Sequence, residues 1–482
     1  MIALTLAEIA EATGGSVHPF GTDTPGTVVS GLVDTDSREI APGGIFAAKP
    51  GAVTDGHAFV GAALDRGAVL ALVEHPVDVA ISQIVVPHVV DALADLAREV
   101  VSRVRALGGS QGEGQGEAQG GLQVVGITGS NGKTTTKNLL ARILQDEGET
   151  VWPKASFNNE VGAPLTMLRV TETTRYLVCE FGASAPGEIA RLAGLVTPDI
   201  GVVLMVGMAH AGGFGGIEAT VAAKSELVDA IRPGGVAVLN RDDPRVAGMS
   251  ARAEDRGVAV RWFGRTEGVD VRASDVEVDA DGTSCLVAAD GVSVPLRLRV
   301  LGEHHVQNAI AAIAAATALG VSLDAAVARL ETVELAERWR MQPLGSASVR
   351  IINDAYNASP DSMAAALRTL AQITGSEQRT VAVLGAMSEL GEYADEEHDR
   401  VGLLAVRLGI QRIVVVGPDA RRMFLEAISQ GSWDGEAVFF ATADEAYDYL
   451  MGELRDGDRV LVKSSNAAGL RHLGDRLGES FS

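Results

Sequence analysis

The fold of this chain is decided by the segment Val124-Val125-Gly126-Ile127-Thr128-Gly129-Ser130-Asn131-Gly132-Lys133-Thr134-Thr135-Thr136. A short apolar run leads into a glycine-rich turn, and a helix-forming stretch, 137–147, follows it. This order predicts a strand, a tight loop and a helix. Such a loop turns its backbone N–H groups inward beside the positive end of the helix, and both features favour bound phosphate.

Two side chains of this loop suit a nucleotide. Lys133 is placed to reach the β- and γ-phosphates, and the Thr134 hydroxyl to hold Mg²⁺. The generic phosphate loop has a glycine six residues before its lysine, where this chain has Ile127. An ordinary glycine turn is the alternative, but the strand before it and the helix after it favour a nucleotide site. The loop residues expected to bind ATP are Gly129, Ser130, Asn131, Gly132, Lys133, Thr134 and Thr135.

Composition limits the classes of protein to consider. A chain of 482 residues suits about three domains, and with 46% hydrophobic residues each domain can bury a core. The net charge of −23 argues against a nucleic-acid surface, because polyanions need clustered Lys and Arg. Two cysteines, Cys179 and Cys285, are too few for a disulfide framework and suit a reducing cytoplasm.

The sequence also predicts that the chain does not enter a membrane. The N-terminus carries Glu8 and Glu11 with no basic start, unlike a signal peptide. No apolar run is long enough to span a bilayer. We expect a cytoplasmic protein and, for the oligomeric state, a monomer.

Alternating apolar runs and helical stretches divide the chain into three α/β units. We expect a small first unit over 1–107, a central unit over 122–340 and a Rossmann-like unit over 341–482. A glycine-rich segment, 108–121, has nothing to pack and is expected to be a flexible linker. The strands of the central unit suit a parallel sheet, and period-2 runs over 269–300 predict antiparallel hairpins appended to it.

The stretch Thr128–Thr135 resembles the variant phosphate loop of the Mur ligase family, which builds the peptide of bacterial cell-wall precursors. Similar segments follow in order along all three units. The resemblance implies an ATP-dependent ligase that converts a carboxylate into an acyl phosphate and then joins it to an amine. It also implies two Mg²⁺ ions and a carbamate formed on Lys224 from CO₂.

In the first unit, Asp34-Thr35-Asp36-Ser37-Arg38 resembles the segment with which two Mur ligases bind uridine diphosphate. The run Pro42-Gly43-Gly44-Ile45-Phe46-Ala47-Ala48 continues the similarity. Taken alone, the polar segment favours a solvated turn over a binding site. The residues that the resemblance assigns to the UDP-sugar peptide are Thr35, Asp36, Ser37, Arg38 and Lys49.

Polar residues follow several predicted strands of the central unit. The segment Asn158-Asn159-Glu160 closely resembles substrate-binding residues of the family branch that adds D-alanyl-D-alanine, with a helix cap as the alternative. Glu180 ends a strand beside the phosphate loop, where open α/β sheets bind ligands and where a carboxylate can hold Mg²⁺. An ion-paired loop glutamate is the alternative there.

Two further residues carry expected metal chemistry by resemblance. His210 matches the family histidine that serves the second metal, and Lys224 matches the lysine that becomes a carbamate. A structural histidine and a solvated helix lysine are the alternatives. The expected metal site comprises Thr134, Glu180, His210 and Lys224.

The end of the central unit carries residues expected at the base and the γ-phosphate of ATP. His304 and Asn308 are four apart on one helix face, and stacking together with an amide hydrogen bond suits adenine. His305 stands where the family usually has asparagine. Arg340 matches an arginine that contacts the γ-phosphate from across the cleft. The expected catalytic residues are Lys133, Lys224, His210 and Arg340.

The start of the third unit, Asn353–Ser362, resembles the Asp-x-Tyr-Asn-Ala-x-Pro segment of the family. It assigns Asp354 to ATP, and Tyr356 and Asn357 to the substrate. The resemblance as a whole favours the branch that adds D-alanyl-D-alanine to UDP-N-acetylmuramoyl-tripeptide in peptidoglycan precursor synthesis.

Three alternatives stay open at this stage. A Mur ligase that adds the third amino acid has an Asp-Asn-Pro-Arg segment in its third domain, and this chain has none there. A folylpolyglutamate-synthase-like ligase lacks a uridine-binding first domain. A non-catalytic nucleotide-binding scaffold would not need Glu180, His210 and Lys224 together.

Overall fold

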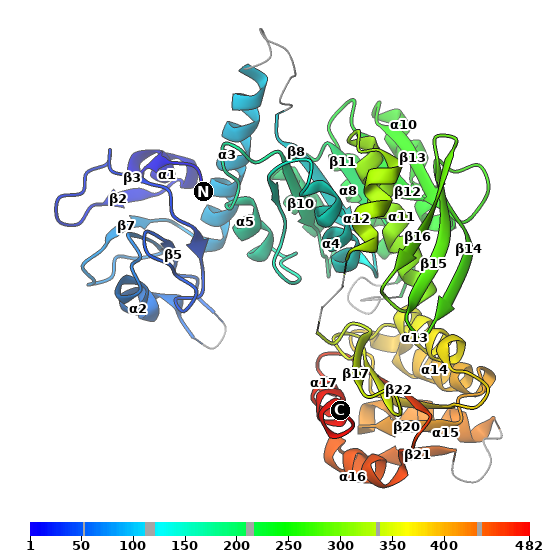
Figure 1. Cartoon of the computed structure of the whole chain (residues 1–482). Coiled ribbons are helices and arrows are strands. Elements are labelled where there is room, and N and C mark those ends of the chain that lie inside the picture. The colour runs from blue at the N-terminus through cyan, green and yellow to red at the C-terminus, as the bar shows by residue number, and fades with distance from the viewer. Residues whose placement is uncertain (52–53, 111–120, 209–215, 334–337, 431–435) are drawn as a thin grey trace.

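The computed structural model describes residues 1–51, 54–110, 121–208, 216–333, 338–430 and 436–482. The chain folds into three α/β units, as the sequence predicts, and the first and third units lie against different sides of the central one (Figure 1). Within these residues, no helix combines the length and the apolar character needed to cross a bilayer.

The first unit contains a five-stranded sheet in the order β2-β7-β6-β5-β4 and a separate pair, β1 with β3. Its strands β4 to β7 pair in parallel, and their apolar residues are buried except for Val85, which is partly buried. The elements are β1 (Leu4–Thr5), α1 (Leu6–Thr13), β2 (Ser16–His18), β3 (Val28–Val29), β4 (Val33–Asp34), β5 (Ile45–Ala47), α2 (Val60–Asp65), β6 (Leu70–Val73) and β7 (Ser82–Val85).

The long helix α3 (Val89–Ser110) connects the first unit to the central one (Figure 1). It packs on α1 from the first unit and on α5 from the central unit. Its Arg105 donates to the Asp199 carboxylate at 2.8 Å, and the backbone N–H of Val124 donates to the same oxygen. The helix extends through 108–110, which the sequence assigns to a flexible linker; 111–120 lie outside the described residues.

Nine strands form the central sheet, in the order β16-β15-β14-β13-β12-β11-β8-β10-β9. The seven strands from β14 to β9 in this order, which include β8, pair in parallel. Strands β14, β15 and β16 form an antiparallel meander, which confirms the hairpins predicted over 269–300. The strands are β8 (Gln123–Thr128), β9 (Thr150–Val151), β10 (Tyr176–Glu180), β11 (Ile200–Val203), β12 (Val236–Asn240), β13 (Ala259–Gly264), β14 (Val271–Asp279), β15 (Gly282–Ala289) and β16 (Val292–Leu298).

Helices cover both faces of the parallel part of this sheet. Alternate residues of β8 face opposite cores: Val124 packs with α5, α6 and α8, whereas Val125 and Ile127 pack with α4, α11 and α12. The helices are α4 (Lys133–Leu144), α5 (Gly162–Met167), α6 (Glu188–Gly194), α8 (Ile217–Ala230), α9 (Pro244–Ala247), α10 (Ser250–Asp255), α11 (Glu303–Ala318) and α12 (Leu323–Glu331).

The C-terminal unit is a six-stranded sheet, β17-β18-β22-β19-β20-β21, in which β18 to β22 are parallel. Its strands are β17 (Gln342–Gly345), β18 (Arg350–Asn353), β19 (Arg379–Leu384), β20 (Arg412–Val416), β21 (Ala437–Phe440) and β22 (Asp458–Lys463). Its helices are α13 (Pro360–Ile373), α14 (Ala394–Arg407), α15 (Arg421–Ser429), α16 (Ala443–Glu453) and α17 (Arg471–Ser480). Helix α13 faces the central unit (Figure 1).

The sequence places the helix after the phosphate loop too late. We expected it to begin at residue 137, but α4 begins at Lys133 and its first turn contains Thr134, Thr135 and Thr136. Threonine is a modest helix former. Burial of all three side chains outweighs that preference, because each is at most 7% exposed.

Candidate active site

The phosphate loop lies at the carboxyl end of β8, between the parallel strands β10 and β11. Gly132, the N-cap residue just before α4, has a left-handed backbone with φ +86°, which disfavours other residues. A Cβ at this position would lie 2.2 Å from the Asn308 amide oxygen. Glycine is therefore required here both by the backbone and by the close approach of α11.

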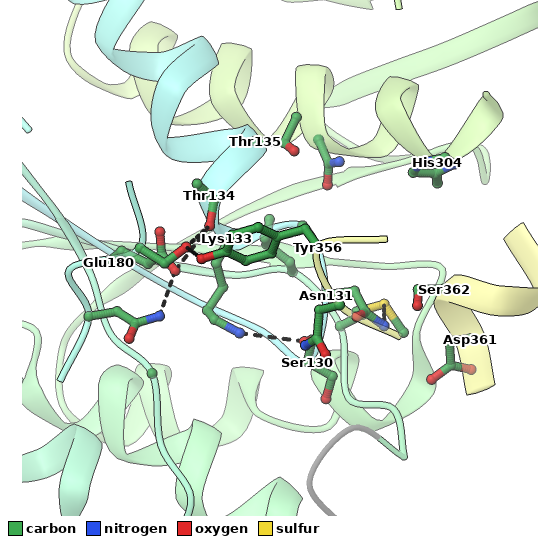
Figure 2. Close-up of a pocket in the computed structure, with 18 of the residues that line it drawn as sticks. Ser130, Asn131, Lys133, Thr134, Thr135, Glu180, His304, Tyr356, Asp361 and Ser362 are labelled. Carbon is green, nitrogen blue, oxygen red and sulfur yellow. Dashed lines mark hydrogen bonds between the residues drawn. The ribbon is translucent and has the colours of Figure 1, made fainter. Parts of the chain in front are cut away.

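A cavity of about 1080 Å³ opens in front of this loop. It is lined by residues of the central unit and by residues of the C-terminal unit, so both units build its walls (Figure 2). Of the expected site residues it is lined by Ser130, Asn131, Gly132, Lys133, Thr134, Thr135, Asn158, Asn159, Glu160, Glu180, Lys224, His304, Asn308, Arg340, Asp354, Tyr356 and Asn357.

Lys133 is held inside the loop. Its ammonium donates to the Gly129 carbonyl at 2.7 Å. It also donates to the Ser130 carbonyl at 3.4 Å (Figure 2). Burial lowers the pKa of Lys133, whereas the charge of Glu180 opposes this shift and that of Arg340 adds to it. A bound phosphate anion beside this ammonium would restore its proton affinity.

Glu180 ends β10 at the edge of the cavity, and its side chain is 1% exposed. One carboxylate oxygen accepts hydrogen bonds from Asn158 at 2.8 Å and from Thr134 at 3.3 Å (Figure 2). The other oxygen has no hydrogen-bond partner among the described residues. A buried, half-satisfied carboxylate beside a threonine hydroxyl offers the hard oxygen donors that Mg²⁺ prefers.

Lys224 reaches the cavity from α8 and is 3% exposed. The alternative of a solvated helix lysine is therefore wrong. Burial, followed by the nearby charge of Lys133, lowers the pKa of Lys224 from 10.5 to about 7. The amine is thus partly neutral near neutral pH, which is the form that reacts with CO₂. His210, the other expected metal residue, lies outside the described residues.

Arg340 crosses from the C-terminal side of the cavity to the phosphate loop. Its guanidinium lies 3.4 Å from the Thr134 hydroxyl and 3.5 Å from the Ser156 hydroxyl. The same group stacks over the Tyr356 ring at 4.1 Å, and the Tyr356 hydroxyl donates to Ser156. Positive charge from two units therefore converges on the space beside Lys133.

Asp354, which the sequence assigns to ATP, lines the cavity and pairs with a lysine. Its carboxylate accepts from the Lys463 ammonium at 2.5 Å, and Lys463 also donates to the Asn357 carbonyl at 3.2 Å. Lys463 is 2% exposed and ends β22, the neighbour of β18. The ion pair fixes the loop that carries Tyr356 and Asn357 at the cavity wall.

Helix α11 forms the end of the cavity where the sequence predicts the adenine base. His304 and Asn308 line it together, as the helical spacing predicts, and the His304 and His305 rings lie 4.1 Å apart. Burial lowers the pKa of His304 to about 4 and the pKa of His305 well below its usual value, so both rings are neutral near neutral pH. Neither ring nitrogen of His305 has a hydrogen-bond partner among the described residues.

The expected uridine site is separate from this cavity. Arg38 pairs with Asp36 at 2.7 Å, and the side chain of Arg38 is 83% exposed. This contact holds the pKa of Asp36 at about 2. Thr35, Ser37 and Lys49 belong to the same unit, and none of these residues lines the cavity as far as the structure describes it.

One site residue, Ser156, escaped the sequence interpretation. It lies in a loop without a distinctive pattern, and only folding brings it to Arg340. Lys463 belongs to a segment that follows the family pattern, but the sequence assigned it no role, although a lysine at the end of a fully buried strand needs a partner. The helix cap that was the alternative reading of Asn158–Glu160 is present at Asn159. Its side chain accepts a hydrogen bond from the Gly162 N–H at the start of α5.

A phosphate loop on a parallel sheet, faced by an arginine from a separate α/β unit, defines a multidomain nucleotide-binding enzyme. Family models match three parts of the chain: Mur ligase family, catalytic domain, over 31–108; Mur ligase middle domain, over 127–316; and Mur ligase, glutamate ligase domain, over 339–466. The chain belongs to the Mur ligase family.

Individual relatives match nearly the whole chain. The UDP-N-acetylmuramoyl-tripeptide--D-alanyl-D-alanine ligase of Mycobacterium tuberculosis is 42% identical over 99% of this chain and 98% of its own length. A crystal structure of MurF from Acinetobacter baumannii is 32% identical, with a TM-score of 0.86 over 99% of both chains. The MurF ligase from Thermotoga maritima in complex with ADP is 26% identical, with a TM-score of 0.78 over 94% of this chain and 97% of its own.

Proposed function

We propose that this chain joins D-alanyl-D-alanine to UDP-N-acetylmuramoyl-tripeptide, with hydrolysis of ATP to ADP and phosphate, in peptidoglycan precursor synthesis. The observation that carries the proposal is the convergence of Lys133, Glu180 and Arg340 on one cavity between two units. The full-length relative that is 42% identical is named for this reaction. The third-amino-acid and folylpolyglutamate alternatives have no comparable support.

The first chemical step activates the peptide. A carboxylate oxygen of the tripeptide attacks the γ-phosphorus of ATP, the bond to the β-phosphate oxygen breaks, and ADP leaves. Lys133 and Arg340 approach the γ-phosphate from the central and C-terminal sides and stabilise the negative charge that shifts between oxygens. The product is an acyl phosphate, which water would destroy, so walls from two units serve to exclude water.

The second step forms the amide bond. The dipeptide amine attacks the acyl carbon, the carbon–oxygen bond to phosphate breaks, and the amine gives up a proton. Arg340 and Lys133 remain beside the departing phosphate. Binding of the reacting ends of the substrates in two adjoining cavities also makes the reacting groups neighbours, which lowers the entropic part of the barrier.

Glu180 and Thr134 fit a Mg²⁺ ion, because they present oxygen donors and one carboxylate oxygen lacks a partner among the described residues. When bound, Mg²⁺ neutralises phosphate charge. We assign Lys224 and His210 to a second Mg²⁺ ion, with Lys224 in its carbamate form. This assignment rests on the family pattern and on the lowered pKa of Lys224. The carbamate would turn a cation beside the metals into an oxygen donor.

A second, smaller cavity of about 360 Å³ is our candidate for the dipeptide. It lies where β18, β19 and β22 end, and it shares Asn357 and Glu389 with the main cavity. The remaining lining is small or uncharged, which suits a short peptide with two methyl groups: Ala358, Ser359, Ser388, Ser465, Asn466 and Ala467. Glu389 at the junction would attract the ammonium end.

The first unit is proposed to bind the uridine diphosphate group through Thr35, Asp36, Ser37, Arg38 and Lys49. We further propose Asn158, Asn159 and Glu160 as contacts to the peptide, because they line the main cavity beside Glu180. The division into units at 107, 121 and 340 belongs to the same proposal, with Arg340 at the last boundary and its backbone neighbours held by the C-terminal unit. The cytoplasmic location and the monomeric state belong to it as well.

The proposal is tested by ADP release from the purified protein with UDP-N-acetylmuramoyl-tripeptide and a panel of amines. Release should depend on both D-alanyl-D-alanine and the tripeptide, and mass spectrometry should detect the pentapeptide. Single amino acids, including glutamate, should give no ADP release. ADP release with a single amino acid, and none with the dipeptide, would refute the assignment.

A further inference from the structure

Arg340 lies between two residues with an unusual backbone. Trp339 and Met341 have positive φ angles, +64° and +47°, although neither is glycine. Left-handed backbone at such residues is uncommon and persists where surrounding contacts hold it. The contacts on either side of Arg340 therefore identify what fixes its position.

Trp339 is held in place by the contacts of its indole ring. Its N–H donates to both carboxylate oxygens of Asp475, at 2.9 and 3.1 Å. Arg338 also donates to Asp475, at 3.0 Å. The guanidinium groups of Arg338 and Arg471 lie 4.7 and 5.0 Å from the centre of the Trp339 ring. A ring with cations near it and a carboxylate at its edge has few other positions available.

Asp475 is itself fixed, because α17 approaches β17 and β18 closely. A Cβ at Gly474 would lie 2.5 Å from the Asn353 side chain, and one at Gly478 would lie 2.7 Å from Leu344. Asn353 donates to the Asp475 carboxylate at 3.0 Å and to the Arg471 carbonyl at 2.9 Å. The carboxylate that holds the indole thus lies on a helix that is packed closely on the sheet of the C-terminal unit.

The backbone around Arg340 is tied to the same unit. The Tyr356 N–H donates to the Trp339 carbonyl at 3.0 Å, and the Met341 N–H donates to the Asp354 carboxylate at 3.0 Å. The Arg340 guanidinium, at the other end of its side chain, lies 3.4 Å from Thr134 in the phosphate loop. Arg340 is therefore carried by the C-terminal unit and presented to the central one.

We infer that Trp339 and Asp475 are positioning residues for phosphoryl transfer, acting through Arg340. The indole–carboxylate contact holds residues 339–341 in the left-handed conformation that aims the guanidinium at the phosphate loop. Without it, this backbone relaxes and the guanidinium leaves the γ-phosphate site. The inference rests on the proposed role of Arg340 in the ligase reaction.

The test is a double-mutant cycle on amine-dependent ADP release by the full chain. Trp339→Phe keeps an aromatic ring between the arginines and removes the N–H donor together with the second ring of the indole. Asp475→Asn keeps the shape of the side chain and removes its charge. Each should lower kcat roughly 10- to 100-fold, the size expected for a small misplacement of a catalytic group. The KM for ATP should change less than about 2-fold, because ground-state binding is retained.

The decisive measurement combines these changes with Arg340→Ala, at enzyme concentrations high enough to measure the residual rate. If Trp339 acts through Arg340, Trp339→Phe has no further effect once Arg340 is absent. An equal loss of kcat in both backgrounds would overturn the inference. Arg340→Ala alone tests the proposed role of Arg340, since an unchanged rate there would remove Arg340 from the mechanism and overturn the inference. The ligase function itself is tested separately, by the dependence of ADP release on the dipeptide in the unmodified chain.

Tyr447→Phe is the matched control. Tyr447 also pairs with α17: its hydroxyl lies 2.8 Å from the Ser480 hydroxyl, and Arg476 lies 4.0 Å from its ring centre. It has no contact with Arg340 among the described residues. This variant should keep kcat within about 2-fold of the unmodified chain. A loss equal to that of Trp339→Phe would mean that kcat responds to any loosening of α17, and would also overturn the inference.

Discussion

Replacing Lys224 by methionine should stabilise the metal-free protein and at the same time abolish its activity. Methionine has a similar length and no charge, and the site is 3% exposed, so an apolar side chain is accommodated there. The lysine, in contrast, is buried with a pKa lowered to about 7, mainly by burial. A group that is useful for chemistry is thus unfavourable for folding.

The size and the sign of the effect follow from proton linkage. At 1.36 kcal/mol for each pH unit, the difference between 10.5 and about 7 amounts to about 5 kcal/mol, of which about 4 kcal/mol applies at pH 7. Between about pH 7 and 10.5 the unfolded chain binds the additional proton, so the penalty shrinks as the pH rises. At pH 9 about 2 kcal/mol is left. These are upper bounds, because polar groups and water relax around a buried charge.

The assay is urea denaturation in EDTA and CO₂-free buffer, at pH 7 and pH 9. Lys224→Met should raise the midpoint at both values, by more at pH 7. Lys137→Met is the matched control, because Lys137 is also fully buried and its ammonium donates to the carbonyls of Pro153 and Ala155 at 3.0 and 2.8 Å. Its replacement leaves those carbonyls unsatisfied and should lower the midpoint. A Lys224→Met protein that is less stable, or that retains ligase activity, would refute the reasoning.

Three further outcomes are expected. Lys133→Ala should reduce ADP release by about 10³-fold or more, since a charge on the γ-phosphate is lost, and a wild-type turnover would reject the loop assignment. Arg38→Ala should raise the KM for the UDP-sugar peptide with little change in the KM for ATP; equal changes in both constants would contradict a separate uridine site. Gly132→Ala should weaken nucleotide binding at least about 10-fold by calorimetry, because its Cβ meets Asn308 at 2.2 Å, whereas Gly187→Ala, with φ +90° and open space around it, should not.

Much of the site could be read from local sequence, because a phosphate loop is built from consecutive residues. The segment 124–136 predicts its own strand, turn and helix, and Glu180 follows from its place at the end of a buried strand. The predicted start of α4, at residue 137, is wrong for a tertiary reason. Threonine is a modest helix former, but the burial of three threonine side chains stabilises the helical first turn.

The sequence by itself determined the α/β class, the three units, the phosphate loop and the residue types of the nucleotide site. These depend on periodicity and on neighbours along the chain. Only the tertiary structure decided that Arg340 reaches Thr134, 206 residues away, and that Trp339 is held by Asp475, 136 residues away. It also decided that Lys224 is buried rather than solvated. The physical reason is that contact, burial and the resulting pKa depend on distance in space, and local patterns carry no information about which distant residues will share a cavity.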